Sequence, residues 1–219
     1  MQRNIVTTKD GSHSLFIPDM NEHYHSSWGA ITESMYVFIN AGFRKIETNT
    51  VHIFEMGFGT GLNALLTLNE ILGTNQKVYY TTVEKYPLTP QEANRLNYPE
   101  LVKVELKNEF SAMHQAPWNQ TTAITRRFSL TKLKSDIQEL DLQGMFDLIY
   151  FDAFAPGKQP QLWSPDIFKM LFSQLKKSGI ITTYAAKGDI RRCWQSLGLN
   201  VEKLPGPPGK REFLRGRKT

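Results

Sequence analysis

A glycine-rich run is the first segment of this sequence whose residue types and spacing could do chemistry. The run E-M-G-F-G-T-G carries glycines at every second position, and glycines allow a tight strand-to-helix turn and let a ligand approach the backbone closely. A dinucleotide-binding fingerprint would need its third glycine at the position of Leu62, and an acid before the first glycine would repel a pyrophosphate. The run therefore fits a cationic sulfonium donor, S-adenosyl-L-methionine, although a purely structural glycine turn would look the same. The candidate cofactor-binding residues of this run are Glu55, Met56, Gly57, Gly59 and Gly61.

Two more acids follow predicted strands and are further candidates for the same cofactor. Glu84 ends the run KVYYTTVE, where a carboxylate can accept hydrogen bonds from both ribose hydroxyls. Asp136 follows a predicted hairpin and is a candidate for the adenine edge. Either acid, taken alone, could equally be an exposed residue at the end of a strand or loop.

A third acid, Asp152, opens the segment D-A-F-A-P-G-K-Q-P-Q-L-W and is the candidate catalytic residue. Methyl transfer to an amine needs a neutral nitrogen held in line with the sulfur–carbon bond, so positioning is the larger part of the work. We therefore interpret Asp152 mainly as a hydrogen-bond acceptor that orients the amine, with Pro156 in the loop that shields it from water. Phe154 and Trp163 are candidates to stack on an extruded nucleobase, and packing beneath the loop is the alternative for both.

Alternating strand and helix patterns predict how these residues are positioned. Apolar runs at 50–56, 77–84, 145–152 and 180–185 predict strands, and the patterns at 62–72, 91–96, 164–179 and 188–198 predict helices. This order predicts an α/β fold, a mostly parallel sheet with helices on both faces and ligands at the carboxyl ends of its strands. A hairpin at 124–136 and an antiparallel strand at the C-terminal edge of the sheet complete the expected architecture.

Length and composition favour a single globular domain over 1–219. The chain has 219 residues, of which 40% are hydrophobic and 21% charged, and it contains one cysteine, Cys193. No internal disulfide or Cys-rich zinc site can be built from one cysteine, and we expect no bound metal. The first residues lack the apolar core of a signal peptide and no run is long enough for a membrane span, so we expect no membrane partner and a cytoplasmic location.

Positive charge is concentrated at the end of the chain. Residues 187–219 contain nine Lys and Arg against three acids, whereas the rest of the chain carries 17 basic and 18 acidic residues. A localised basic surface attracts polyanions, which makes nucleic acid the first partner to test. A solvated basic tail is the alternative.

Several segments resemble the methyltransferase domain of the MnmC-type enzymes, which make 5-methylaminomethyl-2-thiouridine at the wobble position of tRNA. The resemblance spans most of the chain: YHSSWGAITESMYVF (24–38), EMGFGTGLNALL (55–66), VEKYPLT (83–89), FDAFAPGKQPQLW (151–163) and the closing IRRCWQSLG and GPPGKREFLRG. It implies a Rossmann-like class I methyltransferase that transfers a methyl group from S-adenosyl-L-methionine to the aminomethyl nitrogen of the modified uridine.

The resemblance also implies roles for particular residues. Tyr24 joins the glycine run and Glu84 in cofactor binding, residues 1–50 form a leader that covers the cofactor, and Asp152 with its loop faces the substrate amine. Four basic residues are assigned to contact with the tRNA anticodon stem-loop or to local structure: Arg191, Arg192, Lys210 and Arg211.

The chain departs from the bifunctional pattern because it stops at Thr219 without a flavin oxidase domain. We therefore expect 5-aminomethyl-2-thiouridine, supplied by upstream tRNA-modifying enzymes, as the substrate. The competing hypotheses are a class I methyltransferase for a protein or small amine, a non-catalytic RNA-binding module, and a dehydrogenase.

Overall fold

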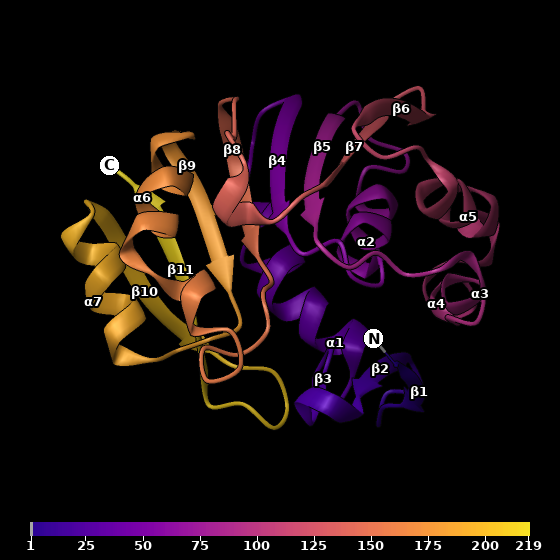
Figure 1. Cartoon of the computed structure of the whole chain (residues 1–219). Helices are drawn as coiled ribbons and strands as arrows, with labels where there is room; N and C mark the ends of the chain where they lie inside the picture. The colour runs from indigo at the N-terminus through magenta and orange to yellow at the C-terminus, as the bar shows by residue number, and fades with distance from the viewer. Residues whose placement is uncertain (1) are drawn as a thin grey trace.

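An eight-stranded sheet forms the centre of the protein in a computed structural model that describes residues 2–219 (Figure 1). The strand order is β10-β11-β9-β8-β4-β5-β7-β6, and the five strands from β9 to β7 run parallel. The strands are β4 (Thr50–Met56), β5 (Lys77–Glu84), β6 (Gln120–Thr125), β7 (Phe128–Lys134), β8 (Phe146–Phe151), β9 (Leu175–Thr183), β10 (Leu199–Pro205) and β11 (Glu212–Lys218). The predicted fold class is confirmed.

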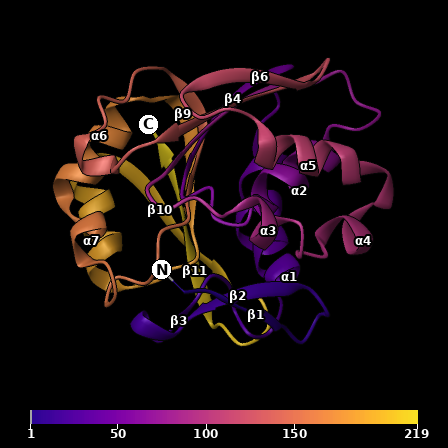
Figure 2. The ribbon, with the colours of Figure 1, turned by 45° about the vertical axis from the view of Figure 1, so that its right-hand side comes forward.

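Helices cover both faces of this sheet, which is why its central strands are continuous apolar runs (Figure 2). One face packs under α2 (Leu62–Glu70) and the short helices beside it; the other packs under α6 (Pro165–Ser173) and α7 (Gly188–Ser196). The short helices are α1 (Ala30–Ser34), α3 (Pro90–Ala93), α4 (Tyr98–Val102) and α5 (Lys107–Gln115), and a π-helical segment, Met35–Asn40, follows α1. Each face therefore has its own apolar core.

The prediction of one helix over 164–179 is wrong in its second half. Ser164 caps the helix as expected, accepting a hydrogen bond from the backbone N–H of Ile167, but α6 ends at Ser173 and β9 begins at Leu175. Leu175 pairs with Phe146 of β8, and Ile180–Thr182 pair with Leu148–Tyr150, with a shift in register between the two sets. These long-range contacts place the segment in the sheet and override its helical pattern.

Smaller differences concern the ends of elements and the sheet edges. The hairpin begins earlier than predicted, because β6 starts at Gln120, and the helix predicted at 91–96 is the single turn α3. At the C-terminal side, β11 is antiparallel to β9 as predicted, but β10 lies outside it and forms the edge.

The N-terminal residues form a separate three-stranded sheet at the carboxyl ends of the parallel strands (Figure 1). Its strands are β1 (Asn4–Thr7), β2 (His13–Ile17) and β3 (Glu22–His23). The loop between β10 and β11 reaches the same end of the molecule, so the first and last parts of the chain meet there (Figure 1). None of the helices within residues 2–219 has the length and apolar character needed to cross a membrane.

Candidate active site

A cavity of about 570 Å³ opens at the carboxyl ends of β4, β5, β7 and β8. This is the edge at which open parallel sheets bind ligands, and the volume is in the range of small-molecule sites. Loops after these four strands form its floor and sides, while residues 22–28 and the β10–β11 loop contribute the remaining wall.

The glycine run turns sharply between β4 and α2. Gly57, Gly59 and Gly61 have φ values of +93°, +50° and +73°, which glycine adopts without strain. A Cβ on Gly57 would lie 2.8 Å from the backbone oxygen of Asp152, so only glycine fits between the two strand ends. Gly57 and Gly59 line the cavity, as does Met56, whereas Gly61 instead faces His114.

Glu84 is held against this loop at the end of β5. Its carboxylate accepts hydrogen bonds from the backbone N–H of Gly59 at 3.0 Å and of Tyr86 at 2.7 Å. A carboxylate has about four acceptor sites, so two remain for a ligand hydroxyl pair. The Gly59 N–H that a dinucleotide phosphate would require is already used.

Asp136 and Tyr24 both line the cavity. Asp136 forms an ion pair of 2.7 Å with Lys85, and this hydrogen-bonded contact lowers the pKa of its carboxyl group. The Tyr24 hydroxyl accepts a hydrogen bond of 3.0 Å from Arg3, and burial raises its pKa to about 12, so Tyr24 is neutral at physiological pH. Both positions agree with the expected cofactor site.

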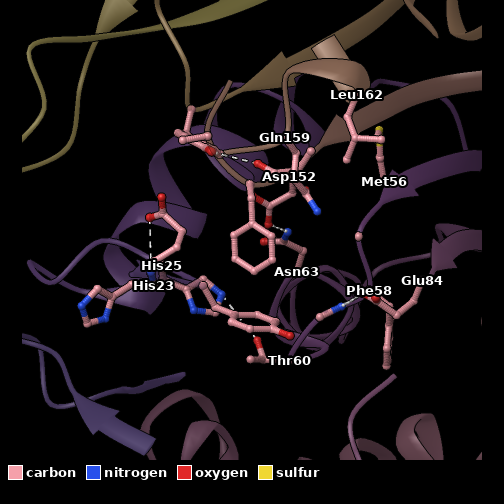
Figure 3. Close-up of a pocket in the computed structure, with 18 of the residues that line it drawn as sticks. His23, His25, Met56, Phe58, Thr60, Asn63, Glu84, Asp152, Gln159 and Leu162 are labelled. Atoms are coloured by element: carbon pink, nitrogen blue, oxygen red, sulfur yellow. Dashed lines mark hydrogen bonds between the residues drawn. The ribbon is translucent and has the colours of Figure 1, made fainter. Parts of the chain in front are cut away.

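Asp152 projects into the cavity from the end of β8, with Asn63 directly beside it (Figure 3). Asn63 Nδ2 donates a hydrogen bond of 2.9 Å to Asp152 Oδ2, which orients the carboxylate and leaves its second oxygen free of this contact. Burial, with a smaller contribution from the charge of Glu33, raises the pKa of Asp152 to about 7. The group can therefore accept a hydrogen bond from an amine at neutral pH and change protonation state close to it.

The prediction that Glu55 contacts the cofactor does not match its position. Glu55 is fully buried and is not among the residues that line the cavity. Burial, followed by the charge of Asp152, raises its pKa well above the ordinary value. Burial of this kind favours the neutral form of the carboxyl group, which lies in the interior rather than in the cavity lining.

The three candidate substrate-binding residues in the loop after Asp152, Phe154, Pro156 and Trp163, lie in different surroundings. Phe154 lines the cavity and contacts Tyr24 edge-to-face at 5.0 Å between ring centroids. Trp163 is only 8% exposed, and its Nε1 donates a hydrogen bond of 2.8 Å to the Phe154 backbone oxygen. Its ring is packed in the core beside Phe151, so the prediction that Trp163 stacks on a nucleobase is wrong. Pro156 lies outside the cavity, in a shallow groove beside α7.

Of the four basic residues assigned to tRNA contact or local structure, only one lines the cavity. Lys210 points into the cavity and forms an ion pair with Glu33, whereas Arg211 is exposed outside it. Arg191 and Arg192 lie on α7, away from the cavity lining, and Arg192 pairs with Asp189. Elsewhere in the C-terminal region, two more basic residues are paired with acids, Lys203 with Glu212 and Arg215 with Glu202.

Sequence reasoning missed four residues that complete the site: Asn63, His25, Glu33 and Tyr184. Asn63 lies in the first turn of the helix after the glycine run, and this position was its only local signal. His25 approaches Thr60 at 3.4 Å, and burial lowers its pKa to about 4, so the ring is neutral (Figure 3). Glu33 lies within the segment 24–38 that carries part of the resemblance, but no role was assigned to it there, and Tyr184 follows β9 directly. Folding brings both residues to the cavity.

The lining has the chemistry of a site for a cationic donor. Glu84, Asp136 and Asp152 place carboxylates along its length, and the glycine run lets a ligand lie against the backbone. S-adenosyl-L-methionine carries a sulfonium and an ammonium but no phosphate, which suits this arrangement. The described residues, 2–219, contain no cluster of three or more His, Cys, Asp or Glu side chains that could hold a metal ion.

Comparison with known families agrees with the chemistry of this cavity. Residues 97–219 match the model of a family described as S-adenosyl-L-methionine-dependent methyltransferase. The chain belongs to this methyltransferase family. Its cofactor is S-adenosyl-L-methionine, and the dehydrogenase hypothesis is excluded.

Relatives cover almost the whole chain. It is 30% identical over 213 residues to the tRNA 5-methylaminomethyl-2-thiouridine biosynthesis bifunctional protein MnmC of Pseudomonas savastanoi pv. phaseolicola, and 28% identical over 221 residues to the MnmC of Actinobacillus pleuropneumoniae. These alignments cover 90% and 89% of this methyltransferase but 32% of each relative, so the chain spans about a third of their length.

Solved structures give the same fold. The crystal structure of MNMC2 from Aquifex aeolicus superposes with a TM-score of 0.78 at 26% identity, covering 98% of this chain and 70% of that one. Spermidine synthase from Thermotoga maritima, at 11% identity and a TM-score of 0.58, covers 100% of this chain and 72% of its own, and shows the shared fold alone.

Proposed function

We propose that this methyltransferase transfers a methyl group to the aminomethyl nitrogen of 5-aminomethyl-2-thiouridine at the tRNA wobble position. The product is 5-methylaminomethyl-2-thiouridine, the nucleoside named in the MnmC relatives. tRNA, through its anticodon stem-loop, is then the partner, and a cytoplasmic location follows from that substrate.

The observation that carries the proposal is the Asp152–Asn63 pair at the end of β8. The Asp152 carboxylate lines the cavity and is fixed by the hydrogen bond of 2.9 Å from Asn63. It can accept a further hydrogen bond from an incoming amine. In the proposed site, Tyr24, Met56, Gly57, Gly59, Glu84 and Asp136 hold the cofactor, and Asp152 and Phe154 hold the amine.

The bound cofactor supplies an activated methyl group on a positively charged sulfur. The acceptor nitrogen must present a free lone pair, which forms the bond to the methyl carbon as the carbon–sulfur bond breaks. The resulting secondary ammonium then releases a proton to water. Asp152 aligns the nitrogen by accepting a hydrogen bond from one of its N–H groups. The aromatic side chains of Tyr24 and Phe154 limit the access of water.

The test is mass spectrometry of wobble nucleosides after incubation of the purified chain with S-adenosyl-L-methionine and tRNA that carries 5-aminomethyl-2-thiouridine. We expect this nucleoside to be converted to its methylated form, and Asp152→Asn to slow the conversion strongly while donor binding persists. If the tRNA is unchanged while a protein or small amine is methylated, the substrate assignment is wrong; if nothing is methylated although tRNA binds, the chain is an RNA-binding module.

A further inference from the structure

An ion pair stands next to Asp152 in the acceptor part of the cavity. Lys210 Nζ contacts the Glu33 carboxylate and lies 4.0 Å from the centroid of the Tyr184 ring. Both charged side chains are largely buried, with exposures of 27% for Lys210 and 8% for Glu33. The other oxygen of Glu33 accepts a hydrogen bond of 2.9 Å from the Ser26 backbone N–H, so the pair has a fixed geometry.

The loop that carries Lys210 is also held in place. The Gly206 N–H donates to the Arg211 oxygen at 3.0 Å, which closes the turn between β10 and β11. Gly209 packs so closely against the ring of Trp28 that any Cβ would overlap it. This contact joins the C-terminal loop to the N-terminal segment, where the two meet beside α1 (Figure 1). Lys210 is thus anchored as part of the wall.

The charges around Asp152 come from several elements. Glu33 of α1 acts against its ionisation and Lys210 acts in favour of it, while the charge of Asp152 acts on Glu55 behind the wall and on Tyr184. Beside the ion pair, burial holds His25 neutral, with a pKa of about 4. Of the other carboxylates, Asp10 acts on His25 and Glu22 acts on Tyr184. The charge of Asp152 also acts on the buried hydroxyl groups of Tyr80 and Tyr98. Among the described residues, Lys210 is the cation that acts on Asp152.

A pocket with Asp152 and Glu33 but no Lys210 would bind an alkylammonium well and methylate it badly. Free alkylamines titrate near 10.4, as lysine does, so the acceptor arrives largely protonated at neutral pH. An ammonium ion has no lone pair with which to attack the methyl carbon. A fixed positive charge nearby disfavours the charged form of the amine and lowers its pKa.

We infer that Lys210, fixed by Glu33, is a specificity-determining positioning residue that makes the pocket select the neutral form of the acceptor amine. The inference rests on the proposed function, since it concerns the amine that Asp152 orients. It also gives Lys210 a different role from the one that the resemblance implies, which is contact with tRNA or local structure.

The test compares steady-state methylation of the tRNA as a function of pH in four variants. Lys210→Met removes the positive charge, Lys210→Arg keeps it, and Glu33→Gln removes the balancing negative charge but keeps an acceptor for the Ser26 N–H. Lys203→Met is the matched control, because it breaks another lysine–glutamate pair, with Glu212, in the same hairpin but outside the cavity.

We expect Lys210→Met to shift the pH at which kcat is half-maximal upward by about one unit or more. At pH 7 its KM should fall while its kcat falls about tenfold, because the ammonium form now binds unproductively. Glu33→Gln should shift the profile in the opposite direction. Lys210→Arg should keep the midpoint pH of the wild type even if its rate differs, and Lys203→Met should follow the wild type.

Shifts of the pH profile in opposite directions for Lys210→Met and Glu33→Gln would show that the charge selects the neutral amine. Loss of structure would instead lower the activity of both variants without moving their pH profiles apart. If Lys210→Met folds poorly, Glu33→Gln still decides, because it keeps Lys210 and must shift the profile downward. Profiles of Lys210→Met and Glu33→Gln that coincide with an active wild type overturn the inference alone. A wild-type protein that methylates no amine overturns the proposed function and the inference together.

Discussion

Replacing Gly57 by alanine tests the close approach of β4 and β8 on which the cavity depends. The new Cβ would sit 2.8 Å from the Asp152 backbone oxygen, at a residue whose φ is +93°. A left-handed backbone costs a non-glycine residue about 1–2 kcal/mol, and overpacking against a backbone atom adds about 1–3 kcal/mol. Alanine also restricts the unfolded chain, which offsets about 0.4–1 kcal/mol, so we expect Gly57→Ala to lower the free energy of unfolding by about 1–4.6 kcal/mol.

Gly73→Ala is the matched control for this substitution. Gly73 also has a positive φ, +75°, but no atom lies within 4 Å of the point that its new Cβ would occupy, so only the backbone cost applies. That cost is partly offset because alanine restricts the unfolded chain, by about 0.4–1 kcal/mol. Gly73→Ala should thus lower the free energy of unfolding by about 1.6 kcal/mol at most.

Urea denaturation measures both unfolding free energies, and calorimetric titration with S-adenosylhomocysteine measures the cofactor site. Any shift of the Asp152 backbone moves the glycine run with it, so Gly57→Ala should also weaken binding at least tenfold, by about 1.4 kcal/mol. Equal stabilities for the two variants, together with unchanged affinity for S-adenosylhomocysteine, would refute the reasoning.

Three further predictions concern buried side chains. The wild-type kcat/KM for methyl transfer should rise with pH through about 7, as Asp152 loses its proton. Asp152→Asn should abolish this rise and lower kcat at least about 100-fold, with the affinity for S-adenosyl-L-methionine nearly unchanged. A large loss of that affinity would make Asp152 a cofactor ligand. Trp163→Phe removes the hydrogen bond to the Phe154 oxygen and should lower stability by about 1–3 kcal/mol without changing tRNA affinity, whereas weaker tRNA binding at unchanged stability would restore the stacking role. Burial lowers the pKa of Lys132 to about 8, so the folded state binds fewer protons than the unfolded state between about pH 8 and 10, and stability should rise with pH there. Lys132→Met should lose this increment, up to about 3 kcal/mol. If urea titrations at pH 7 and 10 give the same change in unfolding free energy for the wild type and the variant, the assignment is wrong.

Local patterns predicted the parts of the fold whose physical cause is itself local. Continuous apolar runs predict buried parallel strands such as β4 and β8, and the glycine spacing predicts the turn after β4. The segment after Ser173 could not be predicted in this way, because lysines and a glycine near a helix end look like a helix stop. In the structure they lie within β9, between Leu175 and Ile180, which both pair with β8.

The same distinction applies to the site. Strand-end acids Glu84 and Asp152 were found because the carboxyl ends of parallel strands must meet at one edge. Glu55 is buried because it pairs with Thr82 and Tyr150, two positions before Glu84 and Asp152 along their strands, and the pairing of strands sets this register.

By itself, the sequence determined the class of fold, the cofactor and the strand ends at which chemistry can occur, because these depend on local residue patterns and on their order along the chain. Only the tertiary structure decided which side chains share the cavity: it placed Lys210 against Glu33, Asn63 against Asp152, and Trp163 in the core. Contacts between residues far apart in the chain depend on how strands pair and loops close, and no local pattern encodes them.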